Sequence, residues 1–190
     1  MRGASKLGLT KAHEWYNLHV VNSLLAFFFV FGRKDPMVDK FLEWTKKNGW
    51  LTERVDSPLS LPDAVVSRYK SIPEEWFDFI GTFTRITNSE DNMWFLTCYD
   101  YQDSYDDFEK MSLEAASGDE AWTNDIKAFW DKTFMIIMSV RGDYHYFAID
   151  LESGKVIEGW EPEFEKVTVV AESFNDFLSK IFTGEISLII

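Results

Sequence analysis

The sequence predicts an α+β fold, with amphipathic helices and antiparallel strands in one chain. Two observations lead to this prediction. Apolar residues recur at helical spacing in several segments, whereas three runs of strand-forming residues between positions 134 and 160 are separated by short turns that contain glycine. A chain of 190 residues with 46% apolar side chains is also long enough to bury a substantial core.

The first expected helix runs from Thr10 to Phe31 and ends at Gly32. Its apolar run over 20–31 is shorter than the roughly 20 residues that cross a bilayer. Three basic residues precede the run, as in a targeting segment, but Arg33 and Lys34 follow it where a cleavage site would need small residues. We therefore expect a buried, docked helix within an N-terminal helical extension, residues 1–35, and no membrane association.

Three further helices are expected before residue 90. Asp35 can cap a helix over 36–48, because Pro36 at its first position loses no intrahelical hydrogen bond and Gly49 supplies a stop. Residues 50–72 read as a loop with a short helix near 63–69. The next helix begins at Pro73 with acids in its first turn, and its apolar stripe is Trp76, Phe77, Phe79, Ile80 and Phe83.

The second half of the chain alternates between the two patterns. Residues 94–99 predict a buried strand, and residues 121–132 predict a helix. The runs 134–140 and 144–151 predict a hairpin with Gly142 in its turn, and 155–160 predicts a third antiparallel strand. A strand near 166–170 then precedes the clearest helix, with Ser173 as its cap, apolar residues at helical spacing and Gly184 at its end.

The acidic charge of the chain disfavours nucleic-acid binding. The net charge is −13, and it is the sum of +4 over residues 1–55 and −17 over residues 56–190. A nucleic-acid binder needs a basic face. Nine acids and one lysine lie between Asp100 and Asp125. This stretch is either a solvated surface or a contact for a basic protein, and the candidate partner-binding residues are Asp100, Asp103, Asp106, Asp107 and Glu109.

Residues with catalytic or metal-binding chemistry form no recognisable set. Cys98 is the only cysteine, so no internal disulfide forms and a cytoplasmic location is expected. Pairing of Cys98 with His145 as nucleophile and base remains a minor alternative. The acidic stretch fails the calcium-loop pattern, because its sixth residue from Asp100 is Tyr105 rather than glycine. We therefore expect no catalytic, metal-binding or cofactor-binding residues.

The C-terminal half resembles the SUKH superfamily, the proteins grouped with the yeast cell-wall synthesis regulators Smi and Knr. The resemblance is carried by the strand with Gly142-Asp143, by the turn Asp150-Leu-Glu-Ser-Gly154 and by the helix start Ser173-Phe-Asn-Asp-Phe-Leu178. Ile72-Pro73 is similar to the family's Leu-Pro helix start, although the Asn-Gly-Gly that usually follows is absent. The resemblance covers about 62–187, with 36–48 as a further element.

This resemblance implies a single SUKH-like α+β domain over 36–190, built from a mixed, largely antiparallel sheet flanked by helices. It also implies a non-catalytic protein-binding module. Bacterial members of the family are immunity proteins that bind and neutralise polymorphic toxins, many of them nucleases. The alternative is a regulatory scaffold of the cell-wall synthesis regulator type, as in fungal members. The expected partner is a basic toxin domain.

Overall fold

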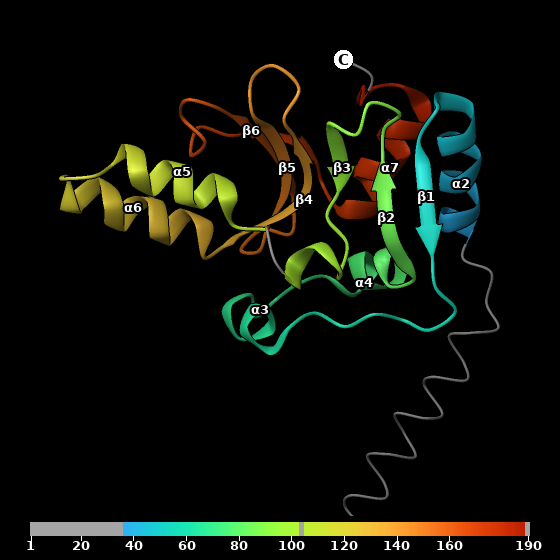
Figure 1. Cartoon of the computed structure of the whole chain (residues 1–190), viewed down its shortest axis with the longest axis horizontal. Coiled ribbons are helices and arrows are strands. Elements are labelled where there is room, and N and C mark those ends of the chain that lie inside the picture. Colours follow the sequence, from blue (N-terminus) through green and yellow to red (C-terminus); the bar gives the residue numbers. More distant parts are fainter. Residues whose placement is uncertain (1–35, 103–104, 189–190) are drawn as a thin grey trace, which may run out of the picture. The chain divides into compact units, whose positions relative to one another are not determined.

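The computed structural model describes residues 36–102 and 105–188 (Figure 1). The expected N-terminal helix, the extension 1–35 and Asp103 lie outside these residues. Seven strands form one sheet in sequential order, and every pairing is antiparallel. The strands are β1 (Leu51–Arg54), β2 (Phe83–Thr87), β3 (Met93–Phe95), β4 (Thr133–Ser139), β5 (His145–Asp150), β6 (Val156–Trp160) and β7 (Thr168–Ala171).

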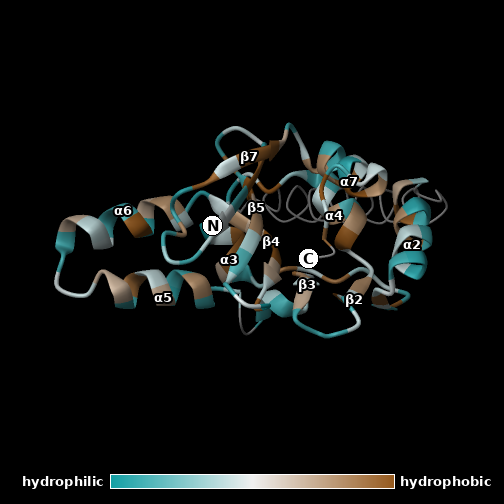
Figure 2. Cartoon of the chain, turned by 90° about the horizontal axis from the view of Figure 1, so that it is seen from above, coloured by the Kyte–Doolittle hydropathy of each residue, from teal (hydrophilic) through white to brown (hydrophobic). Residues whose placement is uncertain are grey.

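Six helices accompany this sheet in the described part of the chain, which confirms the α+β class. They are α2 (Pro36–Asn48), α3 (Asp63–Arg68), α4 (Glu74–Ile80), α5 (Asp107–Ala115), α6 (Glu120–Trp130) and α7 (Phe174–Thr183), with a 3-10 turn at Asp100–Gln102. Figures 1 and 2 show α5 and α6 side by side, as a hairpin that projects from the sheet. Among the described residues, no helix is long and apolar enough to cross a membrane.

An aromatic cluster holds α2, α4 and α7 against one face of the sheet. The ring of Phe41 in α2 lies 4.9 Å from that of Phe79 in α4 and 5.3 Å from that of Phe95 in β3. Phe79 in turn lies 5.3 Å from Phe174 in α7. These are edge-on contacts between fully buried rings, the geometry that aromatic pairs prefer. The three helices therefore cover the face of β3 to which Phe95 points.

Local sequence signals predicted the C-terminal elements correctly. The Ser173 hydroxyl accepts a hydrogen bond from the Asp176 amide at 3.1 Å, and Gly184 ends α7 with a φ of +81°. Gly142 in the hairpin turn has a φ of +75°. The predicted helices at 36–48, 63–69 and 121–132 and the predicted strands from 134 to 170 are confirmed to within a few residues.

Three predictions in the first half were wrong. Residues 51–54 form a strand rather than loop, because they pair with β2 along their length. Phe83 belongs to β2 and not to the preceding helix, although its ring still packs 5.7 Å from Phe79. The strand expected at 94–99 stops at Phe95, since both the amide and the hydroxyl of Thr97 donate to Asp100, each at 2.7 Å, and turn the chain.

Candidate protein-binding groove

A groove of about 500 Å³ opens on the sheet face opposite to α2, α4 and α7. Successive residues of a strand point to opposite faces, so Trp94 points away from the helices that cover Phe95. Trp94 in β3 lies directly opposite Met138 in β4, and together with Leu96 they line the groove. Val140 extends this pairing beyond β4, because its amide donates to the Asn92 carbonyl at 2.8 Å.

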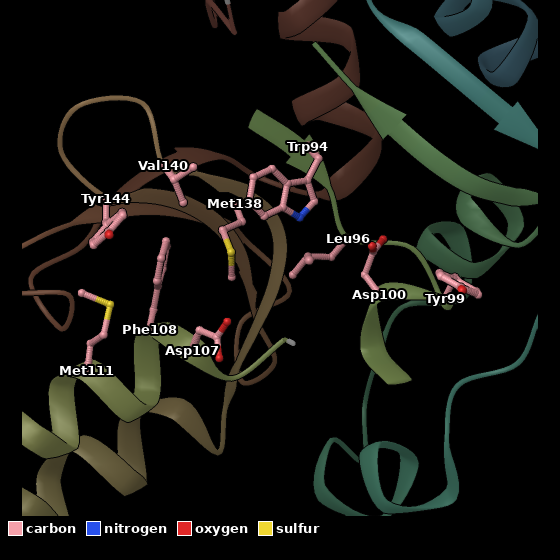
Figure 3. Close-up of a pocket in the computed structure, with 10 residues that line it drawn as sticks. All are labelled: Trp94, Leu96, Tyr99, Asp100, Asp107, Phe108, Met111, Met138, Val140 and Tyr144. Carbon is pink, nitrogen blue, oxygen red and sulfur yellow. The ribbon is translucent and has the colours of Figure 1, made fainter. Parts of the chain in front are cut away.

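The opposite wall of the groove comes from α5. Phe108 and Met111, one turn apart, line it together with Tyr144, which immediately precedes β5 (Figure 3). The ring of Phe108 lies 5.6 Å from Tyr144 on one side and is stacked 5.0 Å from Phe164 on the other. Phe108 is therefore fixed by the core, whereas the two thioethers of Met111 and Met138 supply adaptable apolar surface.

The charge of the groove is negative. Asp100 and Asp107 line it, and in the described part of the chain none of its lining residues is Lys, Arg or His. The nearest ion pairs are made by Lys110, whose Nζ lies 2.7 Å from Asp106 and 3.3 Å from Asp107. One exposed lysine is thus shared between two carboxylates, and water screens both pairs. The groove combines an apolar floor with incompletely balanced acids.

The five acidic candidates occupy different environments. Asp100 and Asp107 lie at the groove, and Asp106 precedes α5 beside them. Asp103 lies outside the described residues. Glu109 points elsewhere, because both of its oxygens accept hydrogen bonds of 2.7 Å from the Arg68 guanidinium. Its role as a partner contact stays a prediction, but its side chain is only 12% exposed and already holds α5 to α3.

Arg68, in α3, is the partner of Glu109 and makes a second ion pair. Its Nε also donates to Asp131 at 2.9 Å, and the bond to Glu109 is the main cause that raises the pKa of the guanidinium above its ordinary value. Burial raises the pKa of the neighbouring Tyr69, whose ring lies 5.3 Å from Phe134 in β4. The wall of the groove formed by α5 is therefore held to α3 by the Arg68–Glu109 pair, while Tyr69 packs α3 against β4.

The apolar half of the groove was not identified from sequence. Trp94 and Met138 belong to the neighbouring strands β3 and β4, and Tyr144 immediately precedes β5, so strand pairing rather than a local sequence pattern brings them together. Every residue of β4 is buried, so its sequence shows no alternation that would reveal a face. The only usable signal was the acidic stretch beside it, which led to Asp100 and Asp107.

The alternative pairing of Cys98 with His145 finds no support in the geometry. Burial raises the pKa of the Cys98 thiol to about 11, so little of the nucleophilic thiolate forms near neutral pH. The His145 Nε2 lies 2.8 Å from Glu158 Oε1 in the adjacent strand. Within the described residues, no group of three or more His, Cys, Asp or Glu side chains could hold a metal ion.

Comparison with known proteins adds no assignment to this geometry: no protein-family model matches the chain, and no curated protein matches it significantly. The likeness to the SUKH superfamily therefore stays a prediction.

Proposed function

We propose that the protein is a non-catalytic protein-binding module, an immunity protein of the SUKH type that acts in the cytoplasm. It binds a basic toxin domain and neutralises it by occluding the toxin's active site. The observation that carries this proposal is the open groove, apolar along its floor and acidic at its sides. The sequence resemblance supplies the class of partner.

The groove is of a size to receive one or two anchoring side chains of the partner, within a larger interface. A stable protein complex buries about 800 Å² on each partner, and a few side chains in desolvated pockets contribute most of the affinity. A volume of about 500 Å³ accepts one or two such side chains. The strongly acidic body around it, with −17 over residues 56–190, attracts a basic partner and raises its association rate.

The experiment is co-expression with the toxin domain encoded by the neighbouring reading frame, followed by a binding measurement on the purified pair. Wild-type protein should restore growth and bind the toxin. Met111→Arg places a bulky cation in the groove and should weaken binding at least tenfold. Leu51→Arg adds the same charge at an exposed position of β1 outside the groove and should change binding less than twofold.

Two results would contradict the proposal. If no candidate toxin is bound or neutralised while cell-wall synthesis enzymes are retained by the wild-type protein, the scaffold alternative replaces the immunity role. If Met111→Arg and Leu51→Arg weaken toxin binding equally, the groove is not the binding surface.

A further inference from the structure

We propose that the groove takes an arginine side chain of the partner protein, with the guanidinium at Asp107 and the aliphatic stem against Trp94, above the buried Leu96 and Met138. This inference rests on the proposed function, because it names the chemistry by which that same groove recognises its partner. Three features of the groove support it: its negative charge, the aromatic rings that line it, and the sharing of Lys110 between Asp106 and Asp107.

The charge of the groove selects a cation. Asp107 is 54% exposed and shares Lys110 with Asp106, so the three groups together keep a net charge of about −1. Asp100 adds a second negative charge. Both hydrogen bonds that Asp100 accepts from Thr97 end on Oδ2, and Oδ1 takes part in neither. An anionic side chain would be repelled by these two carboxylates, and a neutral donor could gain a hydrogen bond but no attraction between opposite charges.

The arrangement of the side chains favours a long stem below a flat cation. Figure 3 shows Leu96 between the carboxylates of Asp107 and Asp100, with Met138 beside it and the indole of Trp94 above. Leu96 and Met138 are only 1% and 3% exposed and form the base of the groove, so methylene groups would pack mainly on the half-buried Trp94 beside them, as long basic side chains do on apolar surface elsewhere. A guanidinium is planar, stacks on aromatic faces and binds a carboxylate through two parallel N–H bonds.

These properties distinguish arginine from lysine. The ammonium group of lysine is a compact, strongly hydrated charge that loses more water on entering an apolar groove. Tyr144 and Phe108 give the groove two further aromatic rings, 5.6 Å apart at their centroids. We therefore expect arginine to bind more tightly than lysine, and both to bind more tightly than an uncharged side chain of the same shape.

Lys110 acts as an internal competitor for the same carboxylate. Its Nζ lies 3.3 Å from Asp107, on the exposed side of α5. Removing it takes away a repulsion of about one unit charge at roughly 6 Å from the incoming guanidinium, which in water corresponds to about a threefold change in affinity. Lys110→Ala should therefore strengthen binding, which a variant that merely damages the structure would not do.

The test is a titration of the full-length, isotope-labelled protein with blocked peptides acetyl-Gly-Leu-X-Leu-Gly-amide. X is arginine, lysine or citrulline, the last being an uncharged isostere of arginine. The readout is the NMR signal of the Trp94 indole N–H, assigned with Trp94→Phe. The arginine peptide should shift this signal to saturation, the lysine peptide should bind about threefold more weakly, and the citrulline peptide at least tenfold more weakly.

Variants locate the contact. Asp107→Asn should weaken the arginine peptide about tenfold, and Lys110→Ala should strengthen it about threefold. Glu120→Gln removes an exposed acid at the far end of the α5–α6 hairpin and should change the affinity less than twofold. Equal binding of arginine and citrulline peptides, an unchanged affinity in Asp107→Asn, or no shift of Trp94 at millimolar peptide would each overturn the inference.

The inference and the proposed function fail separately. If the peptides behave as expected but no toxin is neutralised, the immunity role is lost and the arginine groove stands. If a toxin is neutralised equally well by wild-type protein and by Asp107→Asn, the immunity role stands and the arginine groove is lost.

Discussion

The Glu109–Arg68 pair predicts that Glu109 is needed for stability rather than for partner binding. Its two hydrogen bonds of 2.7 Å join α5 to α3, and the side chains are 12% and 23% exposed. Breaking a fully buried pair costs about 3–5 kcal/mol. Arg68 keeps Asp131 and some contact with water, so we expect Glu109→Gln to lower the free energy of unfolding by about 2 kcal/mol.

Urea unfolding measures this effect. With a slope of about 2 kcal/mol per molar urea, the midpoint should fall by about 1 M. Asp131→Asn removes a partner that is 63% exposed and should cost less than about 0.5 kcal/mol. In an Arg68→Met background the effect of Glu109→Gln should largely disappear. Unchanged stability of Glu109→Gln combined with a tenfold loss of binding to the arginine peptide would refute this reasoning.

Three further predictions concern the core, the cysteine and the last helix. A Cβ at Gly159 would lie 2.6 Å from the hydroxyl and 2.7 Å from the ring of buried Tyr146, so Gly159→Ala should destabilise by about 2–3 kcal/mol in urea unfolding, and a cost below about 0.5 kcal/mol would contradict the packing. With a pKa of about 11, Cys98 should react with a thiol reagent at pH 8 about a hundredfold more slowly in native than in unfolded protein, and equal rates in the two states would contradict its burial. The pKa of Asp176 is lowered by the Glu172 amide and by Lys180, so its contribution to stability is present above the unfolded pKa and is lost as the pH falls through the native one. An NMR titration should place its midpoint below that of a free aspartate, and Lys180→Met should raise it; no upward shift would exclude the ion pair as a cause.

Elements with a complete local signal were predictable from sequence. Helix α7 has a cap at Ser173, an apolar stripe and Gly184 in the left-handed region, and all three agree. The β4–β5 hairpin likewise has its glycine turn. By contrast, β1 and β2 exist because they pair with each other, and residues 51–54 contain no apolar alternation by which a strand could be identified alone.

The candidate groove was predictable only in its charges. Asp100 and Asp107 stand out by composition, but the fact that Glu109 faces inward depends on Arg68, which is 41 residues away in the chain. Helix α5 was not predicted, and its residues were interpreted as a solvated surface or a contact for a basic protein, because its buried side, Phe108 and Ser112, is narrow. The orientation of Glu109 and the position of α5 depend on strand pairing and on residues distant in sequence. Hydrophobic periodicity carries no information about either.

The α5–α6 hairpin is inserted between the neighbouring strands β3 and β4. Different residues therefore meet the requirements of folding and of partner recognition. After β3 the chain forms the hairpin and then returns as β4, which pairs with β3. The hydrogen bonds between these two strands therefore do not involve residues of the hairpin. The floor of the groove belongs to these strands, whereas the wall with Phe108 and Met111 belongs to the hairpin. Substitutions or length changes in the hairpin would reshape one wall of the groove and thereby change which partner binds. The pairing of β3 with β4, on which the fold depends, would stay the same.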